Sequence, residues 1–508
     1  MSAADGTAPV AAPLLEVTVR VAASGRIGAG HAARTCALGS ALRALGARLT
    51  WACDRETIPY LMDRGIPRAE IRELPAAATT GRAGEAELSE AEQKGDAAAT
   101  LSLGRTDWTV IDSYLLGAPW QHAMKAAGVR VLAFDDLVDR AVDCDILVNA
   151  AANPDEYAVL APGAMPLCGL RYALAGHSPL AHRDAEPVLL IAFGAADPAN
   201  LTTATIRAIA ASGFFRTAHA VTVHVQLGAA AAHRAEVEST IASYPWATLL
   251  AAAPGPAGTA RLAIGAAGVG LIERMQDGVP SVVLCAAHNQ RRIMMAAIGA
   301  GTALEARSPE DAVALAARLW RDPAALQAMS AAGRAAVDGG GAARIARAMN
   351  RVQGVSLRAA SMADAAMLHA WRNHPAVRAV SHSQAEIPWE DHVRWLEGTL
   401  GRTDRRILVA VRRGRELGTV RLDVAGSLAT VSITVDPGAI GSGLGPAVLD
   451  ATAEWATANL PGLDLLRAEI RDGNTASVRA FVAAGYRLAD THGGVTEYRR
   501  PLRESTRS

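Results

Sequence analysis

The sequence has little of what marks secreted, zinc-bound or membrane proteins. Its 508 residues include five cysteines, none in a Cys-x-x-Cys pair, so we predict reduced thiols and neither a disulfide framework nor a zinc site. No uncharged apolar run approaches the roughly 20 residues of a membrane span. The first residues, MSAADGTAPVAAP, lack a basic start and a long apolar core, which argues against a signal peptide. We therefore expect a cytoplasmic protein with no membrane partner.

An excess of charge of either sign is also missing. The 50 Lys and Arg residues balance 50 Asp and Glu residues, so there is no electrostatic reason to expect a nucleic-acid partner. Hydrophobic residues make up 50% of the chain and charged residues 20%, which is typical of a globular protein. A chain of this length is too long for one core, and we predict three domains.

Strand-like and helix-like segments alternate from residue 15 to about residue 350. Most of the predicted strands are apolar throughout, as in WTVID (108–112) and SVVLCA (281–286), which is typical of parallel strands covered on both faces. The pattern predicts α/β structure in two Rossmann-like domains, residues 14–172 and 185–352. After residue 352 the strands alternate and are joined by hairpin turns, which predicts a third, α+β domain over residues 355–508.

A glycine cluster in the third domain lies between a predicted strand and a predicted helix. Gly441, Gly443 and Gly445 are spaced so that bare backbone N–H groups can face an anion at the start of that helix. Further along the chain, DGNTASVRAFVAAGYR (472–487) follows another predicted strand. Together these segments resemble the acyl-CoA motifs of the GNAT N-acetyltransferase family.

The GNAT resemblance implies acetyl-CoA as cosubstrate and assigns it six residues. The glycine loop would hold the CoA pyrophosphate, the strand ending near Val435 would bind the pantetheine and the thioester carbonyl, and Asn474 and Ser477 match the N-x-x-S motif. Two positions depart from the family: Ile440 stands where Arg or Gln is usual, and Phe481 stands near the position of a tyrosine general acid.

The start of the third domain, LRAASMADAAMLHAWRNHPAVR (357–378), resembles acetyltransferases that act on the amino group of nucleotide-linked sugars in pseudaminic acid biosynthesis. The match is carried by Trp371-Arg372-Asn373 and by His392 with Trp395. For the base that deprotonates the amine, the candidates are His382, Glu386 and His392, and the sequence does not separate them.

A histidine follows a Gly-Ala-Gly turn in GRIGAGHAAR (25–34). The strand-like LEVTVRV (15–21) precedes it and a helical segment (31–47) follows, so His31 is expected in the first turn of a helix at the carboxyl end of a strand. Open α/β sheets bind ligands there. The positive helix N-terminus disfavours imidazolium, so a neutral His31 could take a proton from water. The alternative is that His31 only caps the helix or packs.

The first two domains resemble the GT-B class of nucleotide-sugar enzymes, and more closely the hydrolases that release UDP from UDP-2,4-diacetamido-2,4,6-trideoxy-β-L-altropyranose. The resemblance implies that His31 activates water and that Tyr114 is a second catalytic residue. It places the substrate against Gly28, Gly30, Arg34, Gly194, Asp197, Gly268, Glu273, Asn289 and Gln290, with Glu273 accepting hydrogen bonds from the ribose. Departures from the family occur at Ala22, Ser113, Ala195, Val269 and Gly270.

No metal is predicted, because Asp143-Cys144-Asp145 leads directly into an apolar strand and is expected to be a capped loop. The two resemblances together imply acetylation of a UDP-4-amino-4,6-dideoxy sugar, followed by hydrolysis to UDP and a free 2,4-diacetamido-2,4,6-trideoxyhexose for nonulosonic acid biosynthesis. Two alternatives remain open: a GT-B glycosyltransferase fused to an acetyltransferase, or a UDP-sugar-binding scaffold in which only acetylation is active.

Overall fold

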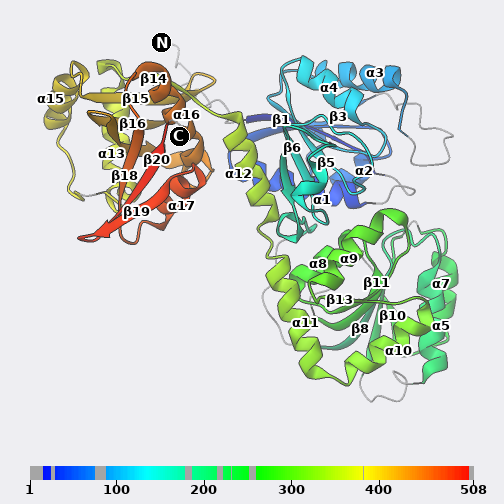
Figure 1. The fold of residues 1–508 in the computed structure, drawn as a ribbon. Coiled ribbons are helices and arrows are strands. Elements are labelled where there is room, and N and C mark those ends of the chain that lie inside the picture. The colour runs from blue at the N-terminus through cyan, green and yellow to red at the C-terminus, as the bar shows by residue number, and fades with distance from the viewer. Residues whose placement is uncertain are drawn as a thin grey trace, which may run out of the picture. The chain divides into compact units, whose positions relative to one another are not determined.

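The computed structural model describes residues 15–23, 29–74, 87–177, 186–213, 221–229, 231–250, 259–381 and 383–502. Contacts divide these residues into two compact units, one of residues 15–346 and one of residues 347–502 (Figure 1). No helix in the described ranges is long and apolar enough to cross a membrane.

The first half of the larger unit is built on a parallel sheet of order β3-β2-β1-β4-β5-β6-β7. Its strands are β1 (Leu15–Val21), β2 (Ala47–Cys53), β3 (Ile71–Glu73), β4 (Trp108–Asp112), β5 (Arg130–Phe134), β6 (Ile146–Asn149) and β7 (Met165–Cys168). Its α-helices are α1 (Gly30–Ala44), α2 (Ile58–Met62), α3 (Glu90–Leu101) and α4 (Ala118–Ala126). All five residues of β4 are buried, as the unbroken apolar pattern of parallel strands requires.

The second half repeats this topology in a parallel sheet of order β10-β9-β8-β11-β12-β13. Its strands are β8 (Glu186–Ala192), β9 (Thr222–Gln226), β10 (Ala247–Leu249), β11 (Ala260–Ala266), β12 (Ser281–Leu284) and β13 (Ala303–Glu305). Its helices are α5 (Leu201–Ser212), α7 (Arg234–Ala242), α8 (Val269–Asp277), α9 (Arg291–Gly299), α10 (Pro309–Trp320) and α11 (Pro323–Ala336), and α12 (Gly341–Gln353) follows.

Both halves reverse their strand order beside the first strand, between β1 and β4 and between β8 and β11. A crevice for ligands forms at such a reversal, outside the carboxyl ends of the strands. The segments that follow β1, β4, β8 and β11 are therefore the places where the fold puts functional side chains.

The smaller unit contains a mixed sheet of order β14-β15-β16-β17-β18-β20-β19. Its strands are β14 (Ser356–Ala359), β15 (Arg405–Arg412), β16 (Arg415–Ala425), β17 (Leu428–Val435), β18 (Leu465–Arg471), β19 (Arg487–His492) and β20 (Val495–Pro501). Its helices are α13 (Ala365–Asn373), α14 (Pro375–Arg378), α15 (Trp389–Leu400), α16 (Leu444–Asn459) and α17 (Thr475–Ala483). The predicted fold class, two Rossmann-like sheets followed by an α+β domain, is confirmed.

Candidate functional sites

Polar side chains gather where three neighbouring strands of the first sheet end. His31 lies in the first turn of α1 after β1, Asp112 ends β4, and Asp136 follows β5. These strands are adjacent and parallel, so their carboxyl ends share one edge of the sheet, at the point where the strand order reverses.

Arg34 joins the two carboxylates of this cluster. Its Nε and Nη2 atoms donate to both oxygens of Asp112 (2.6 and 2.7 Å), and its Nη1 and Nη2 atoms donate to both oxygens of Asp136 (2.8 and 2.9 Å). Burial opposes ionisation of Asp136, but the charge and hydrogen bonds of Arg34 outweigh it and hold the pKa of Asp136 at about 2. Four of the five guanidinium N–H groups are used inside the protein. Arg34, predicted to bind substrate, therefore acts as a positioning residue.

His31 is placed against this network without a hydrogen bond to it. Only 7% of the residue is exposed, and its buried Nδ1 has no hydrogen-bond partner and lies 3.7 Å from Asp112 Oδ1. Burial lowers the pKa of His31, and the positive charge of Arg34 lowers it further. The negative charge of Asp112 and a hydrogen bond with the backbone of Ala22 raise it. The net direction is downward, so His31 is neutral near pH 7 and able to accept a proton.

Tyr114 connects the cluster to the second half of the unit. Its hydroxyl donates to Asp136 Oδ2 (2.8 Å) and accepts from Asn289 Nδ2 (3.2 Å), and its ring meets the His31 ring edge-on with 4.9 Å between centroids. Burial raises the pKa of Tyr114, so it remains a protonated hydrogen-bond donor rather than a base. Asn289 lies in the 3₁₀ turn His288–Gln290 after β12, and its buried Oδ1 has no hydrogen-bond partner.

The N-termini of α1 and α8 face each other beside His31. A Cβ added to Gly30 would lie 3.1 Å from Val269 Cγ2, which is tighter than an ordinary contact, so glycine favours this close approach. Neither helix has a side-chain cap at its N-cap, Ala29 for α1 and Gly268 for α8. Two uncapped helix starts therefore lie close together, and the N–H groups of each favour an anion.

Glu273 lies within α8 and contacts the segment around Gly176, which leads from the first half of the unit to the second. Its Oε1 accepts a hydrogen bond from the Gly176 backbone N–H (3.1 Å). A Cβ on Gly176 would lie 2.6 Å from that oxygen and 3.5 Å from the Cβ of Ala33 in α1. Burial raises the pKa of Glu273. The predicted ribose-binding carboxylate thus lies between α8 and α1, close to the facing helix ends.

The remaining predicted substrate residues have different local contacts: one forms a turn, one caps a helix and one bonds to the backbone. Gly194 adopts a φ of +96° after β8, a turn that favours glycine. The buried carboxylate of Asp197 accepts from the N–H groups of Leu201 and Thr202, so this side chain caps α5 and is not free to bind a ligand. Gln290 Oε1 accepts from the Ala286 N–H (3.2 Å). The predicted Gly28 lies outside the described residues.

The Asp-x-Asp sequence is the capped loop that we predicted. Asp145 Oδ2 accepts from the Val131 N–H and Oδ1 pairs with Arg130, while Asp143 pairs with Lys125 and His122. In the described part of the chain, no three His, Cys, Asp or Glu side chains gather in a way that could hold a metal ion.

In the smaller unit, two neighbouring strands separate where the acyl-CoA residues are predicted. The parallel pairing of β17 and β18 covers only Leu428–Leu465, Ala429–Leu466 and Thr430–Arg467. Beyond these pairs, β17 runs on to Val435 and β18 to Arg471 without pairing to each other. The opening leaves backbone N–H and C=O groups of both strands available to an inserted chain.

A glycine turn follows the open end of β17 and starts α16. Gly441 and Gly443 have φ values of +85° and +83°, and Gly443 is an N-cap without a side-chain hydrogen bond. Two hydrogen bonds fix the turn: Asn350 Nδ2 donates to the Ser442 carbonyl (2.8 Å), and Ser442 Oγ donates to the Ala439 carbonyl (2.6 Å). The N–H groups at the start of α16 are thus presented in a fixed place.

Two other predicted cofactor residues, and the family departure Phe481, have local structural roles. A Cβ on Gly445 would lie 3.0 Å from the Cβ of Ala480, so this glycine lets α16 and α17 pack closely. Asn474 caps α17 by accepting from the Ser477 N–H (3.1 Å). Phe481 is buried against Tyr486, with ring centroids 4.9 Å apart, and it supplies no acid.

Burial and contacts distinguish two of the three candidates for the amine base. His392 is only 3% exposed, and its Nε2 lies 3.0 Å from the Ala365 carbonyl, which makes it a packing residue of α15 rather than a base that reaches solvent. Glu386 is exposed and lies 3.4 Å from Arg378. His382 lies outside the described residues.

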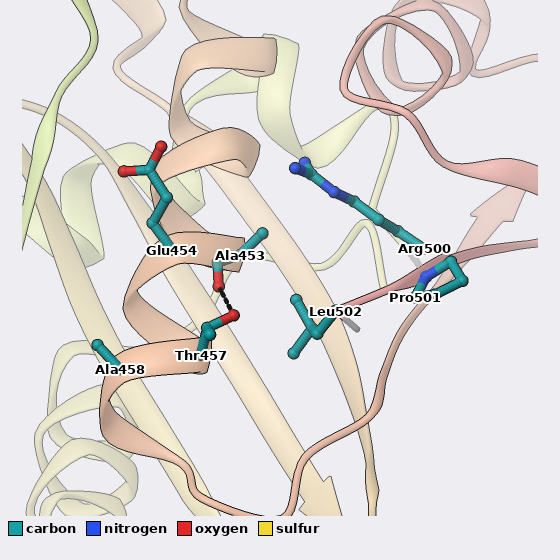
Figure 2. A pocket seen from close by; sticks show the side chains of 7 residues that line it. All are labelled: Ala453, Glu454, Thr457, Ala458, Arg500, Pro501 and Leu502. Carbon is teal, nitrogen blue, oxygen red and sulfur yellow. Dashed lines mark hydrogen bonds between the residues drawn. The ribbon is translucent and has the colours of Figure 1, made fainter. Parts of the chain in front are cut away.

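A pocket of about 410 Å³ in the smaller unit contains none of the predicted site residues. It is lined by the C-terminal half of α16 and the end of β20, with Glu454 and Arg500 on opposite sides (Figure 2). The pocket lies beyond the middle of α16, away from the glycine turn at the start of that helix. We assign it no part in the chemistry.

Two residues of the His31 cluster were counted among those that carry the family resemblance, but sequence reasoning gave neither a role in the site. Asp112 and Asp136 end neighbouring strands, 78 and 102 positions away from Arg34. The available signal was an acidic residue at the end of each of two predicted apolar strands, WTVID (108–112) and VRVLAFDD (129–136). That signal becomes specific only when the strands are known to be neighbours.

Comparisons with known proteins place the smaller unit in a family. A family model described as an acetyltransferase (GNAT) domain matches residues 355–487. Among solved structures, aminoglycoside acetyltransferase AAC(6')-Ib in complex with coenzyme A is 20% identical, with 30% of this chain and 99% of that chain covered and a TM-score of 0.27. Spermidine N-acetyltransferase from Vibrio cholerae is 14% identical over 29% of this chain and 96% of that chain, with a TM-score of 0.27.

The larger unit is similar to the glycotransferase of kitacinnamycin. That structure is 18% identical over 66% of this chain and 98% of that chain, with a TM-score of 0.45. A comparison with curated proteins gave no match. The chain thus joins two Rossmann-like halves to a C-terminal GNAT acetyltransferase domain.

Proposed function

We propose that this chain is a bifunctional nucleotide-sugar enzyme. The GNAT domain transfers an acetyl group from acetyl-CoA to the amine of a UDP-4-amino-4,6-dideoxy sugar, and the larger unit then hydrolyses the product to UDP and a free 2,4-diacetamido-2,4,6-trideoxyhexose. The domain boundaries that go with this proposal are residues 14–172, 185–352 and 355–508. The sugar is proposed from the sequence resemblance, and the chemistry is supported by the two sites.

In the hydrolytic step, His31 takes a proton from water as the water oxygen bonds to the anomeric carbon. The bond from that carbon to the diphosphate oxygen breaks, and UDP leaves with the electron pair. The uncapped N-termini of α1 and α8 favour the negative charge on the leaving group, so this chain's own dipoles can assist departure.

One observation carries the hydrolytic assignment. His31 is a buried histidine whose Nδ1 has no hydrogen-bond partner, yet it lies 3.7 Å from a carboxylate that is itself fixed by Arg34. An imidazolium formed here would be stabilised by Asp112, as a general base needs.

Glu273→Ala should weaken UDP binding by roughly ten- to a hundredfold, because a charged hydrogen bond to the ribose is worth about 1.5–3 kcal/mol. Calorimetry with UDP measures the dissociation constant. The matched control is Glu238→Ala, since Glu238 is an exposed carboxylate of the same half that pairs with Arg234. An unchanged dissociation constant for Glu273→Ala would remove Glu273 from the nucleotide site.

In the acetyl-transfer step, the neutral amine attacks the thioester carbonyl, the carbon–sulfur bond breaks, and CoA leaves as the thiolate. The proton that the nitrogen loses on forming the amide passes to solvent. We propose that the pantetheine lies in the opening between β17 and β18 up to Val435, and that the pyrophosphate meets the turn of Gly441, Gly443 and Gly445. With Phe481 in place of an acid, the thiolate is protonated by solvent.

Gly441→Asp should weaken acetyl-CoA binding by roughly ten- to a hundredfold, because it places a carboxylate where the pyrophosphate is expected. No atom lies within 4 Å of an added Cβ, so the new carboxylate meets no clash, and the backbone strain of a side chain at this positive φ is matched in the control. Gly426→Asp is the matched control, since Gly426 also has a positive φ, +62°, and open space, but lies in the β16–β17 turn. Equal acetyl-CoA affinity in the two variants would contradict the assignment of the glycine turn.

The acetyltransferase half is tested directly by CoA release. Purified protein with acetyl-CoA should release CoA when a UDP-linked 4-amino sugar is added, and the product should carry one new acetyl group by mass. Release of CoA that does not depend on the amino sugar would contradict the proposal.

A further inference from the structure

Three arginines surround one loop of the GNAT domain. Arg372 Nη2 donates to the Ser383 carbonyl (2.8 Å), Arg378 Nε donates to the Gln384 carbonyl (2.9 Å), and Arg471 Nη1 donates to the Ser381 carbonyl (2.7 Å). Their carbonyl partners lie within four residues of each other, so helix α13, helix α14 and strand β18 bring three guanidinium groups to the same place. We call these residues the arginine cluster.

The positive charge of the arginine cluster is poorly balanced. Of the three arginines, only Arg378 has a carboxylate partner in the described part of the chain, the exposed Glu386 at 3.4 Å, and Arg372 and Arg471 form no ion pair there. The Nη1 atom of Arg372 is buried without a hydrogen-bond partner. Burial lowers the pKa of Arg372, and repulsion by Arg378 lowers it further. An unpaired, buried guanidinium N–H is costly, and beside other cations an anion would satisfy it.

The arginine cluster borders the opening between β17 and β18. Arg471 is the last residue of β18, at the end where the two strands are not paired. Leu466, Ala468 and Ile470 pack in the core with residues of α16 and α17, so Arg471 projects from the opposite face of the sheet. The arginine cluster is therefore on the face away from the glycine turn at the start of α16.

We infer that the arginine cluster binds phosphate groups of the acetyl acceptor, so the domain takes an amine that carries a phosphate or diphosphate rather than a polycationic amine. This inference rests on the proposed acetyl transfer. Guanidinium groups bind phosphate oxygens through paired N–H donors, whereas a polyamine would be repelled by three cations. An acceptor held here can present its amine at the strand opening while its phosphates remain outside.

The phosphates of CoA are the other source of the same chemistry. The glycine turn and the N-terminus of α16 already provide an anion site on the helical face, and the arginine cluster lies on the other face. We therefore assign the acceptor's phosphates to the arginine cluster.

The test compares acetyl transfer to two acceptors, a UDP-linked 4-amino sugar and the same amino sugar without UDP, using the full chain. Arg372→Gln and Arg471→Gln should each raise the KM of the UDP-linked acceptor by roughly ten- to a hundredfold. They should leave the KM of acetyl-CoA and the kinetics with the nucleotide-free acceptor at the parental values. Inorganic pyrophosphate should inhibit the parent competitively against the UDP-linked acceptor, and should inhibit both variants less.

Arg394→Gln is the matched control, because Arg394 is an exposed arginine of α15 that pairs with Asp391 in the same domain. Equal losses with both acceptors would show that the arginines only order the loop, and a rise in the KM of acetyl-CoA would assign them to CoA. Either result overturns the inference and leaves the proposed acetyl transfer standing. A parent that acetylates only the nucleotide-free amine overturns the proposed function and the inference together.

Discussion

Replacing His31 with asparagine should slow UDP-sugar hydrolysis by about 10²–10⁴-fold, the usual contribution of a general base. Asparagine keeps much of the size and a hydrogen-bonding group, but it cannot take a proton from water near neutral pH. The loss should appear in kcat, while UDP affinity and acetyl transfer remain near parental values, because neither uses this residue. Steady-state hydrolysis with UDP release as the readout, together with UDP calorimetry, measures both quantities.

The pH profile gives the same prediction a second readout. The neutral ring is the active form, so the parental rate should fall as the pH drops through the pKa of His31. Burial lowers that pKa below the ordinary value of 6.5, so the acid limb should lie below pH 6.5, and His31→Asn should lack it. His122→Asn, which removes an exposed histidine of the same half, should keep the parental rate and limb. Parental turnover in His31→Asn would leave His31 as a structural residue.

Asp112→Asn should lower the free energy of unfolding by about 3–5 kcal/mol, the range found when one partner of a buried ion pair is removed. Asp112 is 1% exposed and takes two hydrogen bonds from Arg34, so the substitution leaves a buried guanidinium with Asp136 as its remaining charged partner. Urea denaturation measures the change. Glu90→Gln removes one partner of an exposed pair with Lys94 and should leave the unfolding midpoint where it is.

A merely structural Asp112 would not shift the titration of His31. Because Asp112 raises the pKa of His31, its removal should move the acid limb of the remaining hydrolysis to lower pH. The pKa of the His31 ring, followed by NMR in both proteins, provides the same comparison without catalysis. An acid limb that stays in place while stability falls would make Asp112 part of the scaffold and would contradict its role toward His31.

The sequence allowed the elements to be predicted more fully than the contacts between them. Residues 15–21 were predicted as a strand, and β1 has those bounds, because an alternating run rich in β-branched residues favours a strand. His31 was likewise placed at a helix start from local signals alone. The partners of Arg34 were not predicted, since they lie 78 and 102 positions away and depend on the order β1-β4-β5.

Other differences arise because one residue type serves several purposes. Asp197 was predicted to bind substrate, but a carboxylate near a helix start is equally suited to capping, and α5 uses it in that way. Gly445 was predicted to expose its backbone to an anion, and the structure adds a packing role for it, because it brings α16 against α17. Short-range patterns cannot reveal the packing role of Gly445, because its neighbour in that contact, Ala480, is far away in the sequence.

Release of UDP is the measurement that tests the central claim most directly. Purified full-length protein is incubated with a UDP-linked 4-amino sugar, with and without acetyl-CoA, and free UDP and free sugar are followed over time. We predict that UDP and a free diacetamido sugar accumulate when acetyl-CoA is present, with no added acceptor other than water. Binding of the sugar nucleotide without release of UDP, or release only after an alcohol acceptor is added, would contradict the proposed hydrolase.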